Sequence, residues 1–197
     1  MGGDSSSKGK PEKSAGLGRE EEYRYLKGWV RHLSAIDPPT GLLNRHGWIT
    51  VAARYLKRAA RSQKRVGVIL ADLDHFQRVN DEYGYDVGEE ALQHIAEVLE
   101  SQLRPGDLLG RWLEEEFILF LLSDETEVLA GVAERLRKAV ESAPMVKDTI
   151  RLQMTISVGA VDWMVKTGDL KEMEAIVSEA ERRVIRAKEQ GRNRVVV

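Results

Sequence analysis

Hydrophobic and polar residues alternate along most of the chain in patterns typical of helices and strands. The apolar run VGVILADL, Val66 to Leu73, is nearly continuous and predicts a central strand that is covered on both faces. Apolar residues at every third or fourth position predict helices over about Asn44–Gln63, Glu89–Leu103, Thr126–Ser142 and Asp169–Gln190. Asn44 is a candidate N-cap, with Leu43 placed to pack on Trp48.

The segments between these helices predict further strands. We expect a hairpin from Leu108–Trp112 and Glu116–Leu122, a strand over about Ile150–Val161 and a last strand at Arg194–Val197. Helices that alternate with strands, interrupted by one tight hairpin, predict an α/β fold in which helices surround a central mixed β-sheet.

Two segments precede this pattern. Residues 1–18 are rich in Gly, Ser and Lys and hold too few apolar residues to offset the entropy of ordering, so they predict a disordered linker or an expression remnant. Arg19 to about Ile36 carries a short heptad stripe formed by Tyr23, Leu26, Val30 and Leu33. This predicts a helix that either dimerises or packs on its own domain, followed by one domain over residues 37–197.

Composition excludes several classes of protein. A chain of 197 residues with a net charge of −2 has no bulk attraction for nucleic acid or an anionic membrane. The chain has no cysteine, which excludes disulfides and thiolate metal sites. No apolar run approaches the roughly 20 residues that span a bilayer, and the first residues lack the apolar stretch of a signal peptide. We therefore expect a cytoplasmic protein, or a cytoplasmic part of one, without membrane insertion.

Acidic residues gather at two places that could hold a metal. Asp72 and Asp74 lie at the end of the predicted central strand, and Glu114, Glu115 and Glu116 lie in the hairpin. Mg²⁺ prefers carboxylate oxygens and substrate phosphates as ligands. The two aspartates share one face if the strand stays regular and diverge if the chain turns after Leu73. By itself the pattern is also typical of a strand end that meets solvent.

Five motifs occur in a fixed order along the domain. They are DPPTGLLNR, ADLDHFQRVNDEYGYDVGEEAL, RWLEEEF, TISVGAV and AERRVIRAKEQGRNRV. In this order they resemble the signatures of the GGDEF family, which comprises diguanylate cyclases and their inactive relatives. The resemblance covers about residues 37–197 and implies a fold like that of the catalytic domain of nucleotidyl cyclases.

The resemblance also implies roles for individual residues. In active members two GTP-loaded domains face each other and form cyclic di-GMP. The matching positions here are Asp72 for the metal, Asn80 and Glu89 for guanine, and Lys188 and Arg192 for phosphate. Three positions depart from the family: Glu89 stands for an aspartate, Tyr85 for a histidine and Gln77 for a lysine.

The signature hairpin departs most. Aligned on Phe117, its first two positions, Leu113 and Glu114, replace glycines that would accept positive φ and allow close approach of a ligand. Glu114 also adds a negative charge where a triphosphate would sit, and two unit charges at about 4 Å repel by roughly 4 kcal/mol at an effective dielectric near 20. We predict loss of cyclase activity, although Glu115 and Glu116 still match the acidic pair that would assist catalysis and, with Asp72, bind Mg²⁺.

A second site is better preserved. The family often carries Arg-x-x-Asp just upstream of the hairpin as an inhibitory site for cyclic di-GMP, with a further arginine on the following helix. Here Arg104, Asp107 and Arg135 match these positions, and five residues separate Asp107 from Leu113 as in the family. Arginine can bind a phosphate or a guanine edge bidentately, and a carboxylate can accept from guanine N–H groups. Alone, the pattern could also be a surface ion pair.

These observations give three hypotheses. The first is a degenerate GGDEF domain that binds cyclic di-GMP through Arg104, Asp107 and Arg135 and signals to a protein partner or within a homodimer. The second is an active or weakly active diguanylate cyclase with product feedback. The third is an interaction module that binds no nucleotide. The hairpin substitutions favour the first or third hypothesis, and the Arg-x-x-Asp site favours the first.

Overall fold

The computed structural model describes residues 35–121 and 126–197. The predicted linker over residues 1–18 and almost all of the predicted N-terminal helix lie outside these ranges. Ile36, the expected last residue of that helix, pairs with Leu43 in an isolated β-bridge and is not helical.

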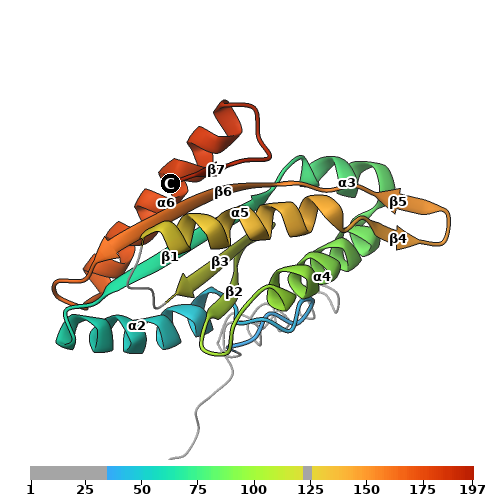
Figure 1. The fold of residues 1–197 in the computed structure, drawn as a ribbon. Coiled ribbons are helices and arrows are strands. Elements are labelled where there is room, and N and C mark those ends of the chain that lie inside the picture. The colour runs from blue at the N-terminus through green and yellow to red at the C-terminus, as the bar shows by residue number, and fades with distance from the viewer. Residues whose placement is uncertain (1–34, 122–125) are drawn as a thin grey trace, which may run out of the picture. The chain divides into compact units, whose positions relative to one another are not determined.

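A five-stranded sheet in the order β2-β3-β1-β6-β7 forms the centre of the domain (Figure 1). Its strands are β1 (Arg65–Leu73), β2 (Leu108–Leu113), β3 (Glu116–Leu121), β6 (Ile156–Met164) and β7 (Val195–Val196). The neighbouring pairs are antiparallel except β6 and β7, which are parallel. The mixed sheet is therefore confirmed. The central strand β1 is buried along its whole length after Arg65, which explains its nearly continuous apolar sequence.

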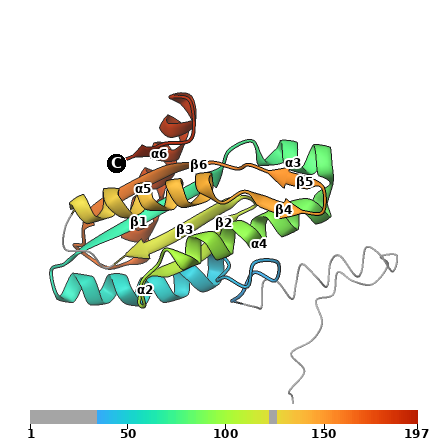
Figure 2. The same ribbon diagram turned by 45° about the vertical axis from the view of Figure 1, so that its right-hand side comes forward.

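Helices cover both faces of this sheet (Figures 1 and 2). On one face lie α3 (Phe76–Tyr83), α4 (Tyr85–Ser101) and α5 (Thr126–Ser142), and on the other lie α2 (Arg45–Arg61) and α6 (Leu170–Glu189). Successive strand residues point to opposite faces, so Ile69 and Ala71 join one hydrophobic cluster while Val68 and Leu70 join the other. No helix in residues 35–121 and 126–197 is both long and apolar enough to cross a membrane.

Local signals fix several helix ends as the sequence predicts. The side chain of Asn44 accepts a hydrogen bond from the backbone N–H of Gly47 at 2.9 Å, and Asp169 caps α6 by accepting from Glu172 N at 2.9 Å. Helix α5 has the predicted bounds, and Leu43 packs in the same cluster as Trp48.

Two elements differ from the prediction. The single strand expected over Ile150–Val161 is wrong, because the chain breaks at residues 153–155 into β5 (Ile150–Leu152) and β6. Strand β5 instead pairs with β4 (Met145–Lys147) in a separate two-stranded hairpin, whose turn contains Asp148 in the left-handed conformation. The sequence analysis also missed α3, and α4 starts earlier than expected, because Gly84 at φ 86° ends one helix and begins the next.

Candidate functional site

The end of the central strand carries a buried acidic site. Asp72 on β1 is only 5% exposed and lies opposite Glu116 in the register of β1 and β3. The Nζ of Lys188, in the last turn of α6, donates to Asp72 Oδ2 at 2.6 Å. Three elements that are distant in sequence therefore bring two acids and one ammonium group together.

Two oxygen atoms in this acidic site are buried without a hydrogen-bond partner. They are Asp72 Oδ1 and Glu116 Oε2. Burial, followed by the charge of Asp72, raises the pKa of Glu116 to about 7. Burial also raises the pKa of Asp72, against the hydrogen bond from Lys188, and raises the pKa of Glu115 together with the charge of Asp72. An oxygen-seeking cation would relieve both the missing contacts and the repulsion.

Asp74 has a different role from Asp72, because the chain turns after Leu73. Its carboxylate accepts from Thr155 Oγ1 and Ser157 Oγ, each at 2.7 Å, and from the backbone N–H of Asn193 at 3.0 Å. It thereby anchors the C-terminal turn, in which Arg192 and Asn193 have positive φ of 61° and 44°. Non-glycine residues keep a positive φ only where their surroundings hold them in that conformation. The turn comes directly after the end of α6, which carries Lys188.

The hairpin accommodates its three glutamates without backbone strain. Glu114 and Glu115 form the turn between β2 and β3, and none of the four residues from Leu113 to Glu116 has a positive φ. The register shifts between Arg111 and Leu113, so Trp112 is an extra residue that packs edge-on against Trp48 at 5.7 Å. The missing glycines therefore do not strain this turn, and what changes is bulk and charge: Leu113 is 49% exposed and Glu114 is also exposed.

Arg111 holds this turn in place. Its Nε and Nη2 donate to the carbonyl oxygen of Glu114 at 2.8 and 2.5 Å, and its Nη1 donates to Asp37 Oδ2 at 3.0 Å. The sequence analysis did not identify this residue. Its position two residues before the hairpin signature was the available signal, but only the fold shows that it reaches Asp37.

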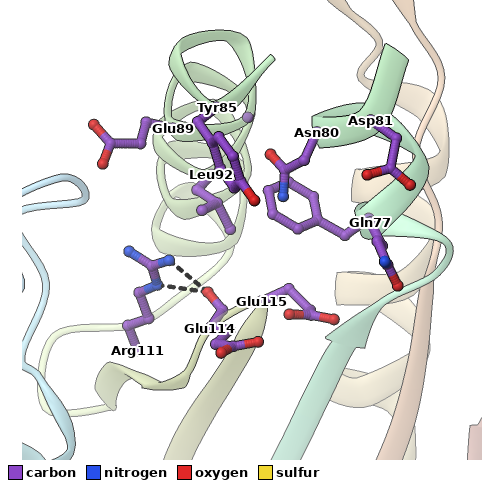
Figure 3. A pocket seen from close by; sticks show the side chains of 11 residues that line it. Gln77, Asn80, Asp81, Tyr85, Glu89, Leu92, Arg111, Glu114 and Glu115 are labelled. Atoms are coloured by element: carbon purple, nitrogen blue, oxygen red, sulfur yellow. Dashed lines mark hydrogen bonds between the residues drawn. The ribbon is translucent and has the colours of Figure 1, made fainter. Parts of the chain in front are cut away.

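A pocket of about 550 Å³ opens beside the hairpin (Figure 3). It brings together the predicted guanine-site residues Asn80 and Glu89 with Glu114 and Glu115. A Cβ atom on residue 88 would lie 1.9 Å from Asn80 Oδ1, so only glycine at this position allows the observed position of the Asn80 side chain. Lys188 and Arg192 do not line the pocket. The predicted base contacts therefore line the pocket, whereas Lys188 of the predicted phosphate contacts pairs with Asp72 at the strand end.

The pocket lining carries an excess of negative charge. Its acidic members are Asp81, Glu89, Glu114 and Glu115. Among the described residues, Arg111 is the cation of the lining; its guanidinium already contacts the Glu114 carbonyl (Figure 3) and forms an ion pair with Asp37. Gln77 also lines the pocket and adds no positive charge. The lining therefore opposes a highly charged anion such as a triphosphate.

The predicted Arg-x-x-Asp site is a well-defined turn. The carbonyl of Arg104 accepts from Asp107 N at 3.1 Å, and Asp107 Oδ2 accepts from Arg104 N at 3.0 Å. Pro105 and Gly106 occupy the two central positions, and Gly106 has φ 103°, as a type II turn requires. Both predicted side chains thus start from one hydrogen-bonded turn, and Arg104 is an exposed residue there.

Arg135 on α5 lies next to this turn. Its Nη2 donates to the carbonyl of Gln102 at 2.8 Å, two residues before Arg104. Within residues 35–121 and 126–197, the Arg104 guanidinium makes no ion pair or hydrogen bond. The third predicted member of the site is therefore close to the loop, and its guanidinium is hydrogen-bonded to the residue two positions before Arg104.

Comparison with known families decides the identity of the domain. Residues 34–194 match the family model described as the diguanylate cyclase GGDEF domain. The chain belongs to the GGDEF family. This GGDEF domain is 29% identical over 168 residues to diguanylate cyclase A of Treponema denticola, covering 84% of the chain and 44% of that protein. The chain spans less than half the length of the first curated relatives it matches.

Solved structures confirm the fold of this GGDEF domain. The diguanylate cyclase SiaD from Pseudomonas aeruginosa, solved with its activator SiaC, is 32% identical with a TM-score of 0.76, covering 90% of this chain and 66% of that one. The coiled coil and GGDEF domain of DgcB from Caulobacter crescentus, solved with cyclic di-GMP, has a TM-score of 0.74. At 23% identity, with 90% of this chain and 92% of that chain covered, DgcB supports the fold alone.

The acidic site of this GGDEF domain has a donor set that suits a divalent cation. Asp72 and Glu116, each with an unpartnered buried oxygen, are register partners on adjacent strands, and oxygen ligands from one or two carboxylates are typical of Mg²⁺ sites. In the parts of the chain that the structure describes, no three Asp, Glu, His or Cys side chains are gathered into a metal cluster. Asp72 and Glu116 therefore fit Mg²⁺ as a two-carboxylate site, and Glu115, the other predicted ligand, lies in the adjacent turn.

Proposed function

We propose that this GGDEF domain binds cyclic di-GMP through Arg104, Asp107 and Arg135 and acts as a signalling receptor that no longer synthesises the dinucleotide. The observation that carries the proposal is the Pro-Gly turn, which presents an unengaged arginine and a carboxylate three residues apart beside a second arginine. On this view the domain works in the cytoplasm, where it reads the concentration of a second messenger.

The chemistry of these side chains suits a cyclic dinucleotide. A guanidinium can hold a phosphate, or the O6 and N7 edge of guanine, with two parallel hydrogen bonds. A carboxylate can accept from guanine N1 and N2. Because the turn is closed by a backbone hydrogen bond and by Asp107 itself, less conformational freedom is lost when the ligand binds. This preorganisation favours the site over a chance surface ion pair.

The substrate side supports loss of synthesis. Glu114 and the exposed Leu113 stand where active relatives would have glycine, and Glu114 is one of four acidic residues that line the pocket. Repulsion of a triphosphate there opposes binding of GTP. We infer that Asn80 and Glu89 remain at the positions of a guanine-binding site, although GTP is no longer bound there for catalysis.

One observation favours a second candidate, a weakly active diguanylate cyclase. Asp72, Glu115 and Glu116 are all present at the acidic site, and the similar curated relatives include a diguanylate cyclase and a probable diguanylate cyclase. Mg²⁺ bound there would act as a Lewis acid on a phosphate. In that case Glu116 or Glu115 would hold a proton near the reacting atoms, and Lys188 and Arg192 would contact phosphate.

A receptor also needs a partner to receive the signal. The structure of SiaD contains its activator protein SiaC, so complex formation with another protein has a precedent in the family. We propose a protein partner or a second copy of this chain for the present domain. A module that only binds proteins and no nucleotide is the outcome if the turn proves inert.

Titration calorimetry with cyclic di-GMP tests the proposal. We expect a dissociation constant in the micromolar range or below, weakened at least about thirtyfold in Arg104→Ala, because a charge-assisted bidentate contact is lost. Arg151→Ala, an exposed arginine on β5, is the matched control and should bind normally. If the unmutated protein gives no heat of binding, the proposal that it is a receptor for cyclic di-GMP is wrong.

Incubation with GTP and Mg²⁺ separates the two candidates. We expect no cyclic di-GMP by chromatography, with or without the Arg104→Ala substitution. Clear turnover that increases when Arg104 is removed would establish a cyclase under product feedback and overturn the first proposal.

A further inference from the structure

The ion pair between Lys188 and Asp72 lies at the centre of the acidic site. Lys188 Nζ is 2.6 Å from Asp72 Oδ2, and the two residues are 116 positions apart in sequence. The side chain of Asp72 is 7% exposed and that of Lys188 is 35% exposed. The lysine is thus the more accessible partner, and its long, flexible stem can leave the carboxylate without opening the core.

The Lys188–Asp72 contact satisfies only one of the carboxylate oxygens in the acidic site. Asp72 Oδ1, on a side chain more than nine-tenths buried, still has no hydrogen-bond partner, nor does Glu116 Oε2 on the neighbouring strand. Negative charge from Glu115 and Glu181 also acts on Glu116, while Lys188 opposes it. Among the described residues, the Lys188 ammonium is the cation that contacts these carboxylates, with the charge of Arg192 also acting on Asp72, and a divalent cation would be better matched to several carboxylates.

Lysine and a divalent ion would compete for the same oxygen atoms. An ammonium group is a compact cation with three donors, and it occupies one side of Asp72. An ion that binds Asp72 and Glu116 together would lie within a few ångströms of Lys188 Nζ, where like charges repel. Both cations cannot be held at the observed distance from Asp72 without a loss of affinity.

We propose that Lys188 is a tethered cation that occupies the acidic site and must be displaced before a divalent ion binds Asp72. The proposal concerns the acidic site and does not rest on binding of cyclic di-GMP. It assigns Lys188 a role in the free protein, in which it neutralises Asp72 and keeps the affinity for divalent ions low.

Mn²⁺ is a suitable probe, because electron paramagnetic resonance reports the free ion directly. We expect Lys188→Met to bind Mn²⁺ at least about tenfold more tightly than the unmutated protein. Lys171→Met, an exposed lysine in the first turn of the same helix, should leave the affinity unchanged. The gain should disappear when Asp72→Asn is added to Lys188→Met.

A second variant guards against misfolding. Lys188→Gln keeps a hydrogen-bond donor for Asp72 but removes the charge, so it should fold and also bind Mn²⁺ more tightly; circular dichroism verifies the fold. Lys188→Arg keeps the charge and should bind as weakly as the unmutated protein. Equal or weaker Mn²⁺ binding in folded Lys188→Gln would overturn the proposal, whatever the result with cyclic di-GMP.

Discussion

The Glu114–Glu115 turn of the hairpin follows the Arg104–Asp107 turn after the six residues of β2, and the two turns differ in the charges that they present to a nucleotide. The Glu114–Glu115 turn presents carboxylates, and its nearby cation, Arg111, is engaged by Asp37 and by the turn itself. The Arg104 turn presents an unengaged guanidinium, with Arg135 close by. If the proposed function is right, one domain has lost affinity for a triphosphate at one turn while a neighbouring turn keeps groups suited to a cyclic dinucleotide.

The two turns also differ in how the backbone is controlled. Gly106 needs its positive φ, so the sequence Pro-Gly determines the shape of the Arg104 turn. The hairpin turn needs no positive φ and is instead held by a bulge at Trp112 and by Arg111. The hairpin turn therefore accepts residues other than glycine without backbone strain. A substitution of Gly106 would strain the backbone, because this residue has a positive φ.

Restoring glycine at the hairpin should have the largest effect. In the double variant Leu113→Gly/Glu114→Gly we expect GTP affinity to rise about a hundredfold, because one carboxylate and one bulky side chain are removed. Calorimetry with GTP measures this, and cyclic di-GMP affinity should not change. Glu97→Gln, an exposed acid on α4, is the control for net charge. If the unmutated domain binds GTP as tightly as the double variant, the proposal that the hairpin turn opposes GTP is wrong.

Substitution of Arg135 should have the next largest effect, on the other turn. Arg135→Ala should weaken cyclic di-GMP binding about tenfold, less than Arg104→Ala, because Arg135 shares its guanidinium with the Gln102 carbonyl. Lys138→Ala, an exposed residue of the same helix, should bind normally. An equal loss in both variants would point to a general charge effect rather than to the site.

Stability should depend on pH through the acidic site. The pKa of Glu116 is raised to about 7 from an ordinary value of 4.5, so the folded state binds the extra proton. Its stabilising contribution is complete below about pH 4.5 and is lost as the pH rises through 7. After allowance for solvent screening we expect a loss of about 1 kcal/mol between these values. Urea unfolding of the unmutated protein and Glu116→Gln at several pH values measures it, and a Glu116→Gln curve with the same slope would contradict this origin.

The smallest effect is expected at Pro105. Pro105→Ala leaves every side chain of the dinucleotide site in place but frees the turn before binding, which should weaken cyclic di-GMP binding about twofold to fivefold. Pro144→Ala, which lies outside the site, is the control. An unchanged affinity would mean that the hydrogen bonds of Arg104 and Asp107 hold the turn without proline.

Much of the fold followed from local patterns, and the differences have physical causes. The buried strand, the Asn44 cap and α5 were confirmed because periodicity and capping are local properties. The break before β6 was missed because it depends on Asp74, whose partners Thr155 and Ser157 are more than 80 residues away.

The candidate site was less predictable than the fold. Motif order singled out Asp72, Asn80 and Lys188, but it did not show that Asn80 lines the pocket or that Lys188 pairs with Asp72. The sequence analysis also expected that replacing the two glycines would matter through positive φ. In the structure Leu113 and Glu114 have no positive φ, and the bulge in the strand register could not be read from the sequence. Arg111 was missed because its contact with Asp37 spans 74 positions.

The C-terminal turn makes the last residues of the domain indispensable. Val195 pairs with Val158 at the sheet edge, and Asn193 supplies a donor to Asp74 while its side chain joins Arg137 and Glu141 on α5. Trimming the chain back past Asn193 would remove all of these contacts at once and release the helix end that carries Lys188. A reporter protein fused after Val197, which is 49% exposed, should by contrast leave the domain undisturbed.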